Sequence, residues 1–82
     1  MRRIRWSGEA VAGLAALSRS EQERVVHRLE LAAEFPRMNP VRTRALFKGL
    51  RHFVVSRRRV VYCRESADAV EVVAVVPGQR AR

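Results

Sequence analysis

Apolar and polar residues alternate at the start of the chain and then change to helical spacing. Across residues 3–6, arginines alternate with Ile4 and Trp6, a pattern typical of a short, half-buried strand. Ser7 follows as a candidate N-cap, with Glu9 in the first turn behind it. Apolar side chains then recur at helical spacing at Ala10, Val11, Leu14 and Leu17. The pattern predicts a strand that leads directly into a first helix.

A second helix is predicted by two overlapping S-x-x-E capping boxes. They run from Ser18 to Glu21 and from Ser20 to Glu23, and in such a box both ends satisfy exposed backbone N–H groups. The apolar positions that follow at helical spacing are Val25, Val26, Leu29, Ala32 and Ala33. Pro36 ends this helix. Because few residues join the two helices, we expect an antiparallel hairpin with one apolar face.

Beyond the loop at Asn39-Pro40, the periodicity changes from that of a helix to that of strands. Runs of β-branched and aromatic residues cover 46–50, 52–55, 59–64 and 70–76. Short turns join the last three runs, which favours an antiparallel meander. The expected fold is a single α+β domain over residues 1–82, with the order β-α-α-β-β-β. The fold has two layers: the N-terminal strand and the last three strands form a mostly antiparallel sheet, and the helical hairpin packs on one face of it. The other face of the sheet is open.

The hairpin between the second and third strands decides which side chains reach the open face. A two-residue turn at Ser56 and Arg57 would pair Val54 with Arg59. Side chains alternate along a strand, so this register directs one set towards the helices: Phe53, Val55, Val60 and Tyr62. The other set faces outwards: His52, Val54, Arg59, Val61 and Cys63. The register therefore predicts that His52 and Arg59 share the open face.

The charge balance points to a polyanionic partner. The 82 residues contain 17 Lys+Arg and 8 Asp+Glu, a net charge of +9, and all the basic residues except Lys48 are arginines. Arginine suits bidentate contact with phosphate, and such a charge attracts nucleic acid or an acidic protein. The alternative explanation is a coding bias towards arginine and alanine.

Other features narrow the class of protein. The single cysteine, Cys63, cannot form an internal disulfide and is expected to act as a small apolar filler. No window approaches the run of about 18 apolar residues that a membrane span needs. The basic opening leads into a polar helix and does not resemble a signal peptide, so a cytoplasmic location is expected. Two histidines 25 positions apart predict no metal site, and nothing predicts a cofactor.

The candidate functional residues are of the kinds that bind phosphate groups and act on them. Metal-free cleavage of RNA needs groups that transfer protons and cations that stabilise charge on phosphorus. The predicted catalytic set is His52, Arg59 and Arg80, and the predicted RNA-binding set is Lys48, Arg51, Arg57 and Arg58. The alternatives are that His52 is an edge-strand residue without a chemical role and that Arg59 forms a structural ion pair. His27 is expected on the solvated side of the second helix, and Trp6 in the core.

Three segments resemble the RelE/ParE superfamily of bacterial type II toxins. "IRWSGEAVAGLAAL" resembles the family's opening strand and helix, "LFKGLRHFVVSRRRVVY" its L-K-G…Y-R-V-I-Y strands, and "VVAVVPGQR" its closing strand. Together they cover nearly the whole chain in order. The resemblance implies a small toxin that a cognate antitoxin neutralises by wrapping around it. From the charge, the antitoxin is expected to offer an acidic, amphipathic segment.

The resemblance implies one of two activities. RelE-like members cleave mRNA on the ribosome without a metal, and ParE-like members inhibit DNA gyrase. Arg59 and Arg80 match arginines of the ribonucleases, and His52 falls where they carry a catalytic lysine. Val54 occupies the position of a second lysine, and the C-terminal tyrosine of some ribonucleases has no counterpart. The first expectation is a ribosome-dependent mRNA endoribonuclease; the alternatives are a gyrase inhibitor and an inactive homologue that binds its antitoxin.

Overall fold

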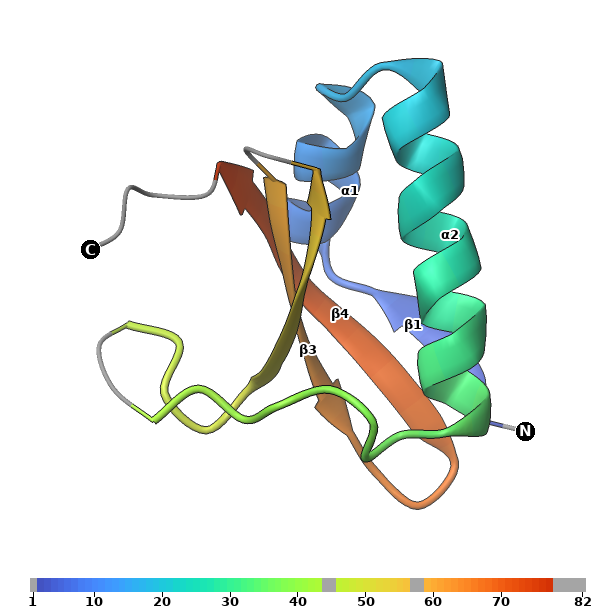
Figure 1. Cartoon of the computed structure of the whole chain (residues 1–82), viewed down its shortest axis with the longest axis vertical. Coiled ribbons are helices and arrows are strands. Elements are labelled where there is room, and N and C mark those ends of the chain that lie inside the picture. Colours follow the sequence, from blue (N-terminus) through green and yellow to red (C-terminus); the bar gives the residue numbers. More distant parts are fainter. Residues whose placement is uncertain (1, 44–45, 57–58, 78–82) are drawn as a thin grey trace.

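The computed structural model describes residues 2–43, 46–56 and 59–77. The elements, in chain order, are β1 (Arg3–Trp6), α1 (Gly8–Ala15), α2 (Arg19–Glu34), β2 (Arg51–Ser56), β3 (Arg59–Glu65) and β4 (Ala69–Pro77). Both helices lie on one side of the sheet (Figure 1). The predicted α+β fold with the order β-α-α-β-β-β is confirmed.

The four strands form one sheet in the order β1-β4-β3-β2. The pairs β2/β3 and β3/β4 are antiparallel, as expected for a meander. The first strand is parallel to β4, with Ile4 opposite Val70 and Trp6 opposite Val72. The helical hairpin is the connection that allows this parallel pairing, because it carries the chain across the sheet between β1 and the meander. Strands β1 and β2 are therefore the two edges of the sheet.

Serine caps fix where both helices begin. The Ser7 hydroxyl accepts a hydrogen bond from the Ala10 N–H at 3.0 Å and donates to the Val73 carbonyl at 2.8 Å, which ties α1 to β4. Ser18 and Glu21 form a complete capping box at the start of α2. Of the two predicted boxes, this one is therefore formed. Ser20 is instead the second residue of the helix.

The core lies between the helices and the sheet. Its buried members come from both helices, the turn between them and three strands: Ala10, Leu17, Val25, Leu29, Phe53, Val61, Cys63, Val70, Val72 and Val75. Ile4, Trp6, Leu14 and Val55 pack against this cluster and are partly buried. Trp6, which is expected in the core, lies at the margin of the core. Burial raises the pKa of the Cys63 thiol to about 11, so this side chain is protonated at neutral pH and serves as an apolar filler.

The predicted register of the β2–β3 hairpin is wrong by one residue. Val54 pairs with Val60 and His52 with Tyr62, and the register shifts between Val54 and Ser56, where Ser56 pairs with Arg59. A bulge of this kind places an extra residue in one strand and changes the pairing beyond it. Every predicted face on β3 is therefore reversed. Val61, Cys63 and Arg59 are directed to the helix side, and Val60 and Tyr62 to the other side.

The face away from the helices is partly covered by the segment before β2. Residues 46–49, which were predicted to begin a strand, form a turn instead. The ring of Phe47 stacks on that of Tyr62 with 4.0 Å between centroids, and Tyr62 is only 6% exposed. We call residues 40–43 and 46–50 the covering segment; in Figure 1 it runs on the side of the sheet opposite the helices.

Candidate functional site

Among the predicted catalytic residues, His52 lies on the sheet face away from the helices. Its ring is half-buried beside Tyr62, with 5.9 Å between the two centroids. The Nδ1 atom is buried and has no hydrogen-bond partner within the part of the chain that the structure describes. Leaving a buried nitrogen without a hydrogen-bond partner lowers the free energy of unfolding by about 1–3 kcal/mol. The ring would therefore gain from a ligand that supplies a hydrogen-bond partner.

Tyr62 holds the covering segment on the sheet. Phe47 stacks on its ring, and the Arg42 guanidinium lies 5.8 Å from the ring centroid, which is within the range of a cation–π contact. Backbone hydrogen bonds from Arg42 to Leu50 and from Gly49 to Arg42, each 2.8 Å long, close the segment into a loop. Gly49 has a φ of 90°, a conformation that favours glycine. The sequence pattern does not predict this cluster, because the expected register places Tyr62 on the helix side.

Arg59 does not join His52. It occupies the helix side of β3, next to the N-terminus of α2, where its positive charge helps to lower the pKa of Glu21. The larger causes of that shift are the hydrogen bond from the Ser18 backbone N–H and the one that Ser56 donates, with 3.1 Å between the Ser56 hydroxyl and Glu21 Oε2. The placement agrees with the alternative that Arg59 takes part in a structural charge interaction.

Two of the predicted RNA-binding residues, Lys48 and Arg51, lie within the described part of the chain. Arg51 donates from Nε to the Glu65 carboxylate and from a terminal nitrogen to the Asn39 carbonyl at 2.8 Å. Both Arg51 and Glu65 are mostly buried, with side-chain exposures of 22% and 26%. A phosphate contact by Arg51 would have to compete with this ion pair. Lys48 is exposed on the covering segment.

Three predicted residues, Arg57, Arg58 and Arg80, lie outside the described residues. Their proposed roles remain predictions. Within residues 2–43, 46–56 and 59–77, the structure contains no group of three or more histidine, cysteine, aspartate or glutamate side chains that could hold a metal ion. Among the helices so described, neither is long and apolar enough to cross a membrane.

Comparison with known proteins identifies chains of similar structure. No protein-family profile matches the sequence, and no curated protein matches it. A variant of YafQ from E. coli superposes with a TM-score of 0.73 and 12% identity, over 94% of this chain and 93% of YafQ. A second YafQ structure from E. coli gives a TM-score of 0.62 and 11% identity, again over 94% and 93% of the two chains.

A chain of the chromosomal ParDE TA system from P. aeruginosa gives a TM-score of 0.75 at 13% identity, over 96% of this chain and 98% of the other. This protein has the same fold as YafQ and the ParDE chain. That agreement confirms the fold predicted from the sequence motifs. YafQ and ParDE superpose on the chain almost equally well, so the overall fold does not choose between them.

Proposed function

We propose that this protein is the toxin of a type II toxin–antitoxin module. The observation that carries the proposal is the reciprocal coverage of the ParDE chain, 96% of this chain and 98% of that one, at a TM-score of 0.75. A fold can serve several functions. In this case, the order of the sequence motifs and the net charge of +9 support the same assignment independently of the fold.

The toxin is held inactive by an antitoxin with an acidic, amphipathic segment. The charge of the chain would speed the encounter with such a partner and make the complex sensitive to salt. Exposed apolar residues supply the other half of the interface. The larger ones on the covering segment, on β2 and after α2 are Phe35, Met38, Val41, Leu46 and Val54.

Inhibition of a protein target, with DNA gyrase as the candidate, is the mode of action that the described residues support better. Val54 is 55% exposed on the face away from the helices, where the ribonucleases that the sequence resembles carry a lysine. Arg59 is directed to the opposite face and lies near Glu21. An apolar surface of this kind suits contact with a protein more than contact with a phosphodiester.

Ribosome-dependent cleavage of mRNA is the second candidate. The observation in its favour is His52, a residue able to transfer protons near neutral pH, on the same face with an unpartnered Nδ1. In this mode Arg80 would supply the cation that Arg59 does not. The contributions of Arg57 and Arg58 would be to hold the RNA backbone.

One pair of assays separates the two modes. Purified protein is added to translating ribosomes, with cuts in the mRNA mapped by toeprinting, and to a gyrase supercoiling reaction. We expect loss of supercoiling without mRNA cuts, and recovery of supercoiling with Val54→Asp. Cuts that disappear with His52→Ala would replace the gyrase mode by the ribonuclease mode. The absence of both effects from folded protein would contradict the proposal of a toxin.

A further inference from the structure

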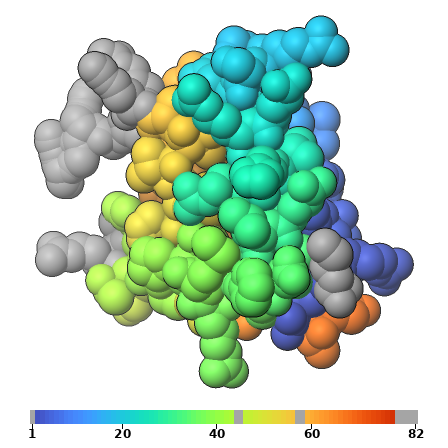
Figure 2. Space-filling model, turned by 45° about the vertical axis from the view of Figure 1, so that its right-hand side comes forward, coloured from blue at the N-terminus to red at the C-terminus, as the bar shows by residue number. Residues whose placement is uncertain are grey.

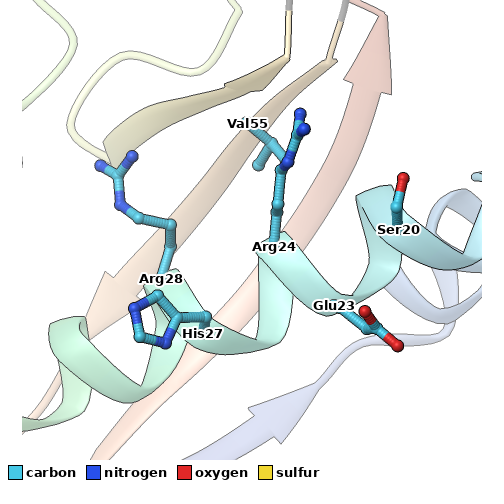
Figure 3. A pocket seen from close by; sticks show the side chains of 6 residues that line it. All are labelled: Ser20, Glu23, Arg24, His27, Arg28 and Val55. Carbon is cyan, nitrogen blue, oxygen red and sulfur yellow. The ribbon is translucent and has the colours of Figure 1, made fainter.

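A shallow groove of about 400 Å³ lies between α2 and the edge strand β2. Its lining residues are Ser20, Glu23, Arg24, His27, Arg28 and Val55. Figure 2 shows the surface on which α2 and β2 lie side by side, and Figure 3 shows Arg24 and Arg28 projecting from the helix towards the strands. This groove is separate from His52, which lies on the other face of the sheet.

Arg28 is fixed at the groove by several contacts. Its terminal nitrogens donate to Asn39 Oδ1 at 3.3 Å and to the Val54 carbonyl at 3.5 Å, and its guanidinium lies 4.7 Å from the centroid of the Phe53 ring. A guanidinium held in this way is preorganised, so it loses little rotamer entropy when it binds a ligand.

Two buried donors of the Arg28–Asn39 pair have no acceptor. They are Nε of Arg28 and Nδ2 of Asn39, neither of which has a partner among the residues that the structure describes. Asn39 is only 4% exposed. Buried donors are almost always paired in folded proteins, and an unpaired one is destabilising. Each donor would gain from an oxygen acceptor, and Nε of Arg28 belongs to a residue that lines the groove.

The charges around the groove favour an anionic acceptor. Arg24 makes no hydrogen bond or ion pair with the described part of the chain. Glu23 is the acidic residue on the rim, and its carboxylate lies 3.9 Å from Nε of Arg19, an exposed residue one turn earlier on α2. Because Arg19 offsets Glu23, the positive charges of Arg24 and Arg28 remain without an opposing charge in the groove.

We propose that this groove binds a carboxylate of an acidic protein segment, with Arg24 and Arg28 as the two cations. A carboxylate accepts several hydrogen bonds and forms bidentate pairs with arginine. A protein segment fits better than a nucleic acid, because Val55 supplies an apolar wall that can contact an apolar side chain next to the carboxylate. The inference rests on the proposed function, since the segment would belong to the antitoxin.

The test uses a short fluorescein-labelled peptide in which glutamates alternate with leucines, and a twin with glutamine in place of glutamate. Fluorescence anisotropy at low salt measures the Kd of each for the full chain. We expect the glutamate peptide to bind more tightly. Arg24→Gln and Arg28→Gln should each raise its Kd about tenfold, the effect of losing one hydrogen bond to a charged group.

Arg3→Gln is the matched control. It removes the same charge from β1, at the opposite edge of the sheet, where the Arg3 and Asp68 side chains are about three-quarters exposed. Its Kd should stay within about twofold of the wild-type value, because distant exposed charges are screened. Equal losses in Arg3→Gln and Arg24→Gln would show attraction by net charge alone and would overturn the proposal. So would a Kd that neither groove variant changes.

Two further outcomes are decisive. If Arg28→Gln fails to fold because it loses the contacts with Asn39 and Phe53, Arg24→Gln alone decides, since Arg24 has no such contacts. Single-stranded RNA and a second, unlabelled acidic peptide are compared as competitors at equal concentrations of negative charge. If the RNA displaces the labelled peptide more effectively, the groove binds nucleic acid and the proposal falls. Groove binding without growth arrest by the induced chain would contradict the toxin assignment only; arrest without groove binding would contradict the groove only.

Discussion

His52 and Tyr62 face each other across β2 and β3, with 5.9 Å between their ring centroids, on the sheet face away from the helices. This pairing determines where the neighbouring residues point. Arg59 lies three positions before Tyr62 on β3, so its side chain is directed to the opposite face, next to α2. His52 on β2 and Arg59 on β3, the two described members of the predicted catalytic set, therefore lie on opposite faces of the sheet.

The separation predicts opposite effects of two substitutions. Arg59→Ala should leave growth arrest by the induced protein intact, because Arg59 lies on the helix side. Val54→Asp should abolish the arrest, because it places a charge on the exposed apolar surface of β2. Val54 is exposed, and Arg59 is half-buried outside the core cluster, so both variants should fold, which circular dichroism can check. Loss of arrest with Arg59→Ala and its retention with Val54→Asp would contradict the assignment of faces.

Glu21 predicts a pH dependence of stability at the start of α2. Its pKa is lowered from 4.5 by the Ser18 backbone hydrogen bond, by Ser56 and by Arg59. A lowered pKa in the folded state means that the stabilisation is present above the unfolded value and is lost as the pH falls through the folded value. Glu21→Gln should therefore be less stable than wild type at pH 7, and the difference should shrink below pH 4.5.

Urea unfolding between neutral and acidic pH measures this difference. Glu30→Gln is the control, because Glu30 is exposed on the same helix and its substitution removes the same charge. A deficit in Glu21→Gln that persists unchanged at the lowest pH would show that the charge of Glu21 is not responsible.

Gly13 marks the closest approach of α1 to the sheet. A Cβ at this position would lie 2.2 Å from the Val75 carbonyl oxygen and 3.0 Å from the Val75 Cβ. Alanine favours a helix by about 1 kcal/mol relative to glycine, but the clash forces α1 away from β4. Gly13→Ala should therefore lower the free energy of unfolding by about 1–3 kcal/mol.

Gly8 provides a comparison on the same helix. A Cβ there meets nothing within 4 Å, so Gly8→Ala should be neutral or slightly stabilising. Chemical denaturation of the two variants gives the contrast directly. Equal stability of Gly13→Ala and Gly8→Ala would mean that α1 does not pack on β4 as described.

The sequence predicted the order of the elements because each depends on local signals. The Ser18 capping box, the apolar stripe of α2 and the proline after it act within a few residues. The register of the β2–β3 hairpin could not be obtained in the same way. It depends on a bulge between Val54 and Ser56, and a single extra residue exchanges the two faces of the following strand.

The residues of the candidate site could likewise be placed from the sequence only in part. His52 was placed correctly because it precedes the bulge, and Arg59 was misplaced because it follows it. Phe47 was expected in a strand, but tertiary packing on Tyr62 holds it in a turn. Arg28 and Asn39 carry no motif at all. Their contact crosses from α2 to the loop after it, and its unpaired donors are visible only in three dimensions.

The Arg51–Glu65 ion pair predicts a structural role for Arg51. It joins β2 to the end of β3 and reaches the Asn39 carbonyl. Arg51→Ala should lower the free energy of unfolding by about 1–3 kcal/mol, since it leaves a mostly buried carboxylate without its partner. A double-mutant cycle with Glu65→Ala in urea unfolding should give a coupling energy of about 1 kcal/mol or more. Additive effects would show that the two side chains do not interact.

Induced expression in a bacterial host tests most directly whether the chain is a toxin that a partner neutralises. The measurement is the growth rate after induction, alone and with co-expression of a candidate antitoxin that carries an acidic, amphipathic segment. We expect arrest by the chain alone and recovery of growth with the partner. Unimpaired growth while soluble, folded protein accumulates would contradict the toxin assignment.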